Sequence, residues 1–266
     1  MLVKNVKEYL DVRFPKENAE EFDQGAIGLA IGSEKNEVTN IMLALDLNKD
    51  VVYDAISKNC NLIITHHPFL FNPIQKVLFD TEKGEIIKLM CQNNISLYSM
   101  HTNLDVGDGG VNDTLASMLG IEDIRIINDE PSKGNYLRYG IINETSLFEL
   151  SQNVKKIFNL SGVKVLGDLN KKIRKIDVVG GSGAHTSDII NAINKKLDCY
   201  ITGEVHLNNS QLASYNGLSI IEVKHGVEKF VFISLIEELR KQFKELFDFS
   251  NDIYITEIET DLFNYL

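Results

Sequence analysis

Short apolar segments alternate with segments of helical periodicity along this chain, and this alternation constrains its fold more than any other feature. The first passage, residues 40 to 120, contains NIMLALD, NLIIT and ISLYSM as predicted strands, with KDVVYDAIS, GEIIKLMCQ and GVNDTLASMLG as predicted helices. Strands that alternate with short helices favour βαβ units, whose mostly parallel sheet is covered by helices on both faces. We therefore expect an α/β protein.

The same order returns later in the chain. YLRYGIIN, KIDVVGG, CYITG and LSIIEV are predicted strands, and SLFELSQNVKKIF, TSDIINAINKKL and NNSQLASYN are predicted helices. KNCNLIITHH resembles KKLDCYITGEVH, and NISLYSMH resembles GLSIIEVKH, which suggests a duplication, although two such passages also arise independently in α/β proteins. We expect two similar domains, residues 1–128 and 129–266, that meet in the polar segment IINDEPSKGN.

Charge and cysteine content narrow the class of protein. Thirty-eight acidic side chains outnumber 27 basic ones and give a net charge of −11, which disfavours a nucleic-acid-binding groove. Cys60, Cys91 and Cys199 form no CxxC pair, as in a reduced cytoplasmic protein with free thiols. The N-terminal segment is amphipathic, and no apolar run reaches the about 18 residues of a membrane span. We expect a soluble, cytoplasmic protein.

Two adjacent histidines, His66 and His67, follow the predicted strand NLIIT. Neighbouring side chains of a strand point to opposite faces, but Pro68 cannot continue a central strand and turns the chain away. In such a turn both imidazoles can converge on one site, or each can face one of two ions. The alternative is a pair of solvent-exposed loop histidines. Strand ends of this kind are where open α/β sheets place their ligand crevice.

A second group follows the next predicted strand, in MHTNLDVGDGGVND. His101 comes directly after the strand, and Asp105 is expected in the loop that follows. Carboxylate oxygens and neutral imidazoles together bind divalent zinc, iron or manganese. For Asp108 and Asp113 we expect a structural role instead, in turns and in capping the next helix.

A third group is KHGVEKFVF, where His225 and Glu228 lie three residues apart at the start of a predicted helix. Side chains at this spacing share one helix face, so they can bind one metal, or the carboxylate can bridge two. The alternative is a polar first turn in which the helix dipole favours Glu228. Five ligands from separate loops suit two ions roughly 3.5–4 Å apart. The candidate ligands are His66, His67, Asp105, His225 and Glu228.

ITHHPFLF, HTNLD followed by GGVND, GGSG, YITGE and KHGVE, in this order, resemble the NIF-three-like family, often labelled GTP cyclohydrolase 1 type 2. The resemblance extends from FPKENAEEFD to KHGVE. It implies two similar, intertwined three-layer α/β/α domains, a dinuclear metal site in the cleft between them, and a ring-like homohexamer. By motif, the five candidates match the family's metal ligands, and His101 lies at the edge of the site, either as a group that supports the ligands or as a catalytic proton-transfer group.

The sequence departs from the family pattern in three places. The family commonly has three residues between the late histidine and glutamate, whereas here only Gly226 and Val227 intervene. One helical residue turns a side chain by about 100°, so Glu228 is the ligand that the sequence supports least. FDQGAIGLAIG is longer than the family's turn, and Asp23 therefore receives no role. Longer relatives carry an inserted middle domain, which we expect this chain of 266 residues to lack.

These features favour a metal-dependent hydrolase that uses two divalent ions to activate water. If the family label applies, the substrate is GTP, whose imidazole ring opens with release of formate, with His101 as general acid or base. GGSGAHTSD either binds an anion at a helix N-terminus or forms a tight turn. Two alternatives remain open: a dinuclear phosphoester hydrolase, and a non-catalytic metal-binding scaffold.

Overall fold

The protein divides into two compact units, and the first of them is formed by two segments that are separate in sequence. The structure, a computed structural model, describes residues 1–126, 136–245 and 252–259. Within them, residues 1–107 and 232–259 form the first unit and residues 108–231 form the second. This division differs from the expected one at residue 128, because the chain leaves the first unit after Gly107 and returns to it at Phe232. The expected boundary segment lies, except for its first residue, outside the described residues.

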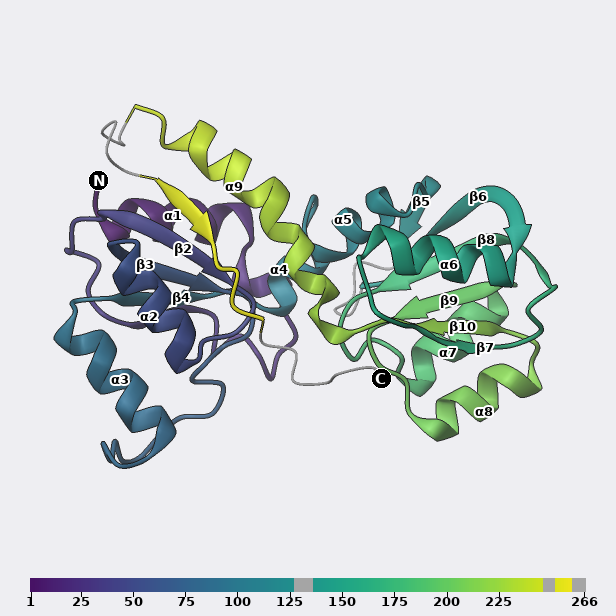
Figure 1. Ribbon diagram of the computed structural model, residues 1–266, viewed down its shortest axis with the longest axis horizontal. Coiled ribbons are helices and arrows are strands. Elements are labelled where there is room, and N and C mark those ends of the chain that lie inside the picture. The colour runs from purple at the N-terminus through teal and green to yellow at the C-terminus, as the bar shows by residue number, and fades with distance from the viewer. Residues whose placement is uncertain (127–135, 246–251, 260–266) are drawn as a thin grey trace. The chain divides into compact units, whose positions relative to one another are not determined.

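The first unit is built on a five-stranded sheet in the order β1-β4-β3-β2-β11. Its strands β2, β3 and β4 lie side by side in Figure 1. The neighbours β2, β3, β4 and β11 pair in parallel, and β1 pairs antiparallel with β4 at the edge, so the expected mostly parallel sheet is confirmed here. The sequence patterns did not predict β1 and β11. The strands are β1 (Gly28–Ile31), β2 (Asn40–Ala44), β3 (Cys60–Thr65), β4 (Ser96–Ser99) and β11 (Ile253–Ile255).

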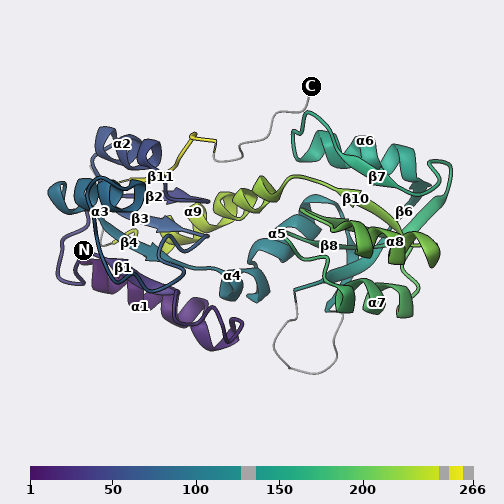
Figure 2. The ribbon, with the colours of Figure 1, turned by 90° about the horizontal axis from the view of Figure 1, so that it is seen from below.

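Helices cover both faces of this sheet. Figure 2 shows α2 (Lys49–Ser57) and α3 (Glu82–Gln92) on the opposite side of the strands from α1 (Val3–Arg13). The α2 and α3 face contains an apolar cluster that includes Met42, Val52, Ile63 and Ile86. On the other face α9 (Val231–Gln242) packs beside α1, where the Tyr9 hydroxyl donates a hydrogen bond of 2.5 Å to Glu238. The unit is therefore a three-layer α/β/α structure.

The second unit contains a mixed six-stranded sheet in the order β5-β6-β8-β9-β10-β7. Its centre, β8, β9 and β10, is parallel, whereas β5, β6 and β7 pair antiparallel with their neighbours. The strands are β5 (Glu122–Ile126), β6 (Arg138–Ser146), β7 (Lys164–Leu166), β8 (Lys172–Val179), β9 (Cys199–Thr202) and β10 (Ser219–Glu222). The helices are α5 (Val111–Met118), α6 (Leu147–Ile157), α7 (Thr186–Asn194) and α8 (Leu207–Tyr215), with α7 and α6 on opposite faces in Figure 2.

The two units share one motif. In the first, β2, β3 and β4 are adjacent parallel strands connected by α2 and α3. In the second, β8, β9 and β10 are adjacent parallel strands connected by α7 and α8. This similarity agrees with the two similar α/β domains that the sequence predicts. None of the helices in the described part of the chain is both long and apolar enough to span a bilayer.

One buried acid in the second unit contributes to the pH dependence of stability. Asp177 of β8 is fully buried, and neither of its carboxylate oxygens has a hydrogen-bond partner among the described residues. It lies beside Tyr200 of β9, which belongs to the apolar cluster under α7 and α8. Burial, reinforced by the charge of Asp188, raises the pKa of Asp177 well above its usual value.

We expect Asp177 to destabilise the fold progressively as the pH rises above about 4, the usual Asp pKa. Below that pH, Asp177 is protonated in both the folded and the unfolded state. Above it, the unfolded state loses the proton, whereas the folded state keeps it until the pH reaches the raised pKa of the folded state. The free energy of unfolding of Asp177→Asn, measured relative to that of the wild type, should therefore rise by more than about 1 kcal/mol as the pH increases from 4 to 7. Urea denaturation across this range measures the difference, and parallel stability curves would contradict it.

Candidate metal centre

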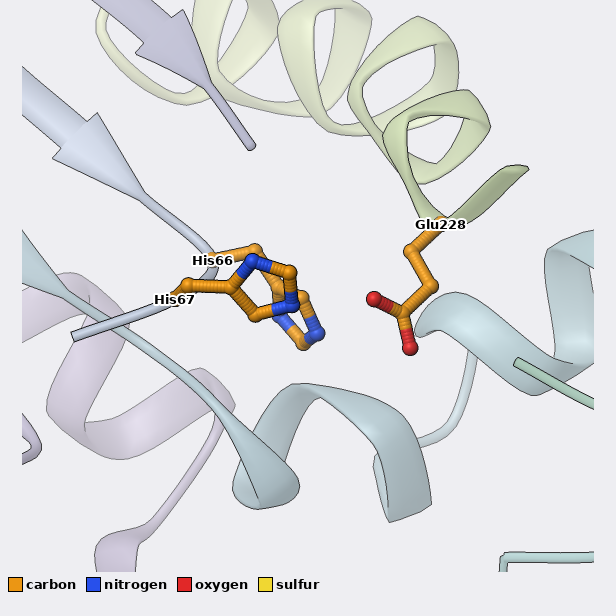
Figure 3. Close-up of side chains that lie close together, drawn as sticks. All are labelled: His66, His67 and Glu228. Atoms are coloured by element: carbon orange, nitrogen blue, oxygen red, sulfur yellow. The ribbon is translucent and has the colours of Figure 1, made fainter. Parts of the chain in front are cut away.

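His66 and His67 lie together at the C-terminal end of β3. The amide of His66 donates to Ala44 O at 3.1 Å and that of His67 to Leu45 O at 2.9 Å, which continues the pairing beside β2 past the last strand residue. The two ring centroids are only 4.9 Å apart, and both rings project from the same stretch of chain in Figure 3. The predicted convergence of neighbouring imidazoles before Pro68 is therefore what the structure has.

His101 directly precedes a short helix, α4 (Thr102–Val106), so the expectation that Asp105 lies in a loop is wrong. The helix begins here because the Asn103 side chain organises the turn: its Oδ1 accepts a hydrogen bond from the His101 amide at 2.8 Å. Its Nδ2 donates to Phe14 O at 2.6 Å. The helix directs Asp105 toward the β3 histidines, with Asp105 Oδ1 at 3.4 Å from His66 Nε2.

In the second unit, His225 and Glu228 belong to a 3₁₀ helix, η2 (His225–Phe230), rather than to an α-helix. A 3₁₀ helix has three residues per turn, so side chains at i and i+3 eclipse each other. The His225 Nε2 to Glu228 Oε2 distance is 3.3 Å. Glu228, the ligand that the sequence supports least, therefore lies beside His225.

Two glycines of the GGSG motif make room for Glu228, which is only 4% exposed. A Cβ on Gly180 would lie 2.9 Å from Glu228 Cγ, and a Cβ on Gly181 would lie 2.5 Å from Glu228 Oε1. Gly181 also has a φ of +56°, a conformation that favours glycine. The motif therefore forms the turn after β8 against which the Glu228 carboxylate rests.

The imidazole–carboxylate distances fall into two classes. The Nδ1 atoms of His67, His101 and His225 lie 2.7, 2.8 and 2.9 Å from carboxylate oxygens, which is hydrogen-bond distance. The Nε2 atoms of His66 and His225 lie 3.4 and 3.3 Å from Asp105 and Glu228. Two donors that share one tetrahedral cation, at bonds of about 2.0–2.2 Å, are separated by about 3.4 Å. Within each unit, the Nε2 and carboxylate donors therefore fit a shared cation.

Three carboxylates that the sequence patterns did not indicate bind these Nδ1 atoms: Asp46, Asp23 and Glu204. Asp46 is the last residue of the predicted strand NIMLALD, and Glu204 directly follows the predicted strand CYITG, so a polar residue at a strand end was the available signal. Asp23 is fully buried and also accepts hydrogen bonds from the Thr102 amide and hydroxyl, at 3.1 and 2.7 Å. Its partner His101 is 78 residues away, and no local pattern indicates that contact.

Hydrogen bonds keep two of these acids ionised. Burial acts to raise the pKa of Asp23, but the bonds from His101 and Thr102 outweigh it and lower that pKa below its usual value. Burial likewise acts to raise the pKa of Glu204, and the bonds from His225 and the Ser182 hydroxyl lower it. Each therefore presents a negative charge to its histidine at neutral pH.

Asp113, one of the two acids of the glycine-rich segment for which the sequence predicts a structural role, has such a role. Asp113 lies in the first turn of α5, and its Oδ2 accepts a hydrogen bond from Gly109 N at 2.8 Å. Its Oδ1 binds the side chain of Arg138, which is only 2% exposed. Of the predicted site residues, the first unit groups His66, His67, His101 and Asp105, and the second groups His225 and Glu228.

Known proteins resemble the chain along its whole length. The family described as Duf34/NIF3 (NGG1p interacting factor 3) matches residues 1–262. A curated Streptococcus pneumoniae protein named GTP cyclohydrolase 1 type 2 homolog is 31% identical over 270 residues, which cover 100% of both chains. A Clostridium acetobutylicum protein of the same name is 36% identical over 212 residues, which cover 78% of this chain and 76% of the relative.

Solved structures share the fold. A Bacillus cereus protein related to NIF3 superposes with a TM-score of 0.91 at 23% identity, and the match covers 100% of this chain and 99% of the other. A Staphylococcus aureus hypothetical protein superposes with a TM-score of 0.90 at 28% identity and the same coverage. These similarities confirm the α/β fold class that the sequence predicts.

We expect Gly181→Ala to weaken the binding of a divalent cation by about tenfold or more, because the added methyl group displaces the Glu228 carboxylate. Gly217→Ala is the matched control: Gly217 also has a positive φ, +74°, but a Cβ there meets nothing within 4 Å. Competition for Zn²⁺ with a chromophoric chelator measures both affinities. Equal losses in the two variants would show that backbone strain, and not contact with Glu228, causes the effect.

Proposed function

Because this chain belongs to the Duf34/NIF3 family, we propose that it is a metal-dependent hydrolase that binds divalent cations. His66, His67 and Asp105 are the ligands from the first unit, and His225 and Glu228 are those from the second. Figure 3 draws His66, His67 and Glu228, which have the side-chain chemistry of a cation site. The observation that carries the proposal is the pair of Nε2–carboxylate separations, 3.4 and 3.3 Å.

The donor set indicates the type of metal. Imidazole nitrogens and carboxylate oxygens without a thiolate suit divalent zinc, iron or manganese. Five ligands exceed the need of one tetrahedral ion and support two ions with open coordination positions. When bound, such ions supply Lewis acidity and activate water for hydrolysis at neutral pH.

His101 is the proposed proton-transfer group of this site. Its ring lies 5.5 Å from that of His66 and 5.7 Å from that of His67, measured between centroids. Its Nδ1 is held by Asp23, so the opposite ring nitrogen, Nε2, is the one available to a substrate. An imidazole suits this role because it exchanges protons near neutral pH.

Two exposed phenylalanines beside His101 support a planar aromatic substrate, such as the guanine base of GTP. The Phe71 ring lies 6.1 Å from that of His101, and the Phe22 ring lies 6.2 Å from that of Phe71. Phe22 is 68% exposed and Phe71 is 40% exposed, which leaves ring surface for stacking. Together with the name of the curated relatives, this pair supports the opening of the GTP imidazole ring with formate release.

We expect the metal-loaded protein to release formate from GTP, and we expect His66→Ala and Asp105→Ala to abolish this release because each removes a ligand. His185→Ala is the matched control, since this histidine is exposed at the start of α7. A formate assay, run beside generic phosphoesters and with and without chelator, measures the outcome. If only phosphoesters were hydrolysed, the protein would be a phosphoesterase and not a cyclohydrolase. If it bound metal but turned over no substrate, it would be a metal-binding scaffold.

We further propose the ring-like homohexamer that the family resemblance implies. An exposed apolar segment after β3 offers contact surface, because Ile74, Val77, Leu78 and Phe79 are 39, 43, 54 and 59% exposed. Light scattering should give six times the chain mass of 30.0 kDa. Replacing Leu78 and Phe79 by serine should lower that mass, and a monomeric wild-type protein would contradict the proposal.

A further inference from the structure

Asp46 and Glu204 are not among the proposed metal ligands. Each binds the Nδ1 atom of one of the proposed metal-binding histidines. We infer that they are positioning residues, which fix His67 and His225 in the neutral tautomer whose Nε2 carries the lone pair. This inference deepens the proposed function and rests on it only in the assignment of Nε2 as the metal ligand.

The tautomer follows from hydrogen-bond chemistry. An ionised carboxylate can only accept hydrogen bonds, so the imidazole nitrogen beside it must carry the proton. His67 Nδ1 lies 2.7 Å from Asp46 Oδ1, and His225 Nδ1 lies 2.9 Å from Glu204 Oε1. In a neutral ring the other nitrogen, Nε2, then keeps its lone pair. A carboxylate behind an imidazole also fixes the ring orientation and raises its basicity as a ligand.

The same arrangement occurs in both units. Asp46 lies two residues after β2, and its histidine follows β3, the neighbouring parallel strand. Glu204 lies two residues after β9, and its histidine follows β10, again the neighbouring parallel strand. In each unit the end of one strand therefore supplies the acid and the end of the next supplies the imidazole. Its presence in both similar motifs argues against a chance surface contact.

In the second unit, a further residue holds the acid in place. The Ser182 hydroxyl donates a hydrogen bond of 2.8 Å to Glu204 Oε2, while Glu204 Oε1 binds His225. Both carboxylate oxygens are thus engaged, although the Glu204 side chain is 57% exposed. Ser182 is the serine of GGSG, so this motif both contacts Glu228 through its glycines and orients His225 through its serine.

The chain contains an internal comparison. Asp23 binds His101 Nδ1 at 2.8 Å in the same way, but His101 is not among the proposed metal ligands. If the acids act by orienting ligands, only the loss of Asp46 or Glu204 should change metal affinity. If they act merely by adding negative charge or rigidity near the site, the loss of Asp23 should change it as well.

The first test measures Zn²⁺ affinity of the full chain by chelator competition. We expect Asp46→Ala and Glu204→Ala each to weaken binding by about 10- to 100-fold, whereas Asp23→Asn, which keeps an acceptor for the Thr102 amide and hydroxyl, leaves the affinity unchanged. Wild-type affinity in the Asp46 and Glu204 variants would overturn the inference. A similar loss in all three variants would overturn it too, because it would indicate a general electrostatic effect.

The second test observes the tautomers directly in the metal-free protein. Long-range ¹H–¹⁵N NMR spectra, recorded above the usual imidazole pKa of about 6.5, distinguish the two neutral forms. We expect the Nδ1–H form at His67 and His225 in the wild type, and a shift toward the Nε2–H form at His225 alone in Glu204→Ala. An unchanged His225 signal would refute the positioning role. Because this readout needs no metal, it stands even if the protein binds none.

The third test separates Ser182 from a general structural effect. If Ser182 acts only through Glu204, Ser182→Ala should weaken Zn²⁺ binding in the wild type but cause no further loss in Glu204→Ala. Thermal unfolding of each variant checks that the fold is retained. Additive losses of Zn²⁺ affinity in the double variant would contradict the proposal that Ser182 acts on His225 through Glu204.

Discussion

The hydrogen bond between an imidazole Nδ1 and a carboxylate is the interaction on which the candidate site depends. It occurs at His67, His101 and His225, at 2.7 to 2.9 Å, and in each case it determines which ring nitrogen stays available for other chemistry. For His67 and His225, strand ends bring the two groups together because parallel neighbours present their C-terminal ends at one edge of the sheet, whereas Asp23 lies in a turn before β1. The two sheets therefore position a carboxylate next to the Nδ1 atom of an imidazole, at His67 and at His225.

Local helix geometry is the second constraint on the site. The Glu228 side chain lies beside His225 because the two residues are three apart on η2, a helix with three residues per turn. The glycines before α7 complete the arrangement, since side chains on Gly180 or Gly181 would occupy the volume that Glu228 fills.

Much of the first unit could be predicted from sequence, because its parallel strands are buried on both faces and appear as continuous apolar segments. The antiparallel strand β1 and the strand β11 were missed: β1 is short, and β11 joins the sheet through pairing with β2, more than 200 residues away. The short helix α4 was expected as a loop, since its start depends on Asn103 binding Phe14 O, a contact that no local pattern indicates. The return of α9 to the first unit depends in the same way on contacts with α1.

The candidate residues could be identified from the sequence alone, because histidines and acids directly after apolar segments fall at strand ends whatever the rest of the fold does. The βαβ order of elements was predictable for a similar reason, since hydrophobic periodicity is a local property of the chain. Which acid binds which imidazole was not predictable, as Asp23 and His101 show, because hydrogen bonds between residues far apart in sequence depend on how strands and helices pack. The tertiary structure also decided that η2 is a 3₁₀ helix, and hence that Glu228 lies at 3.3 Å from His225.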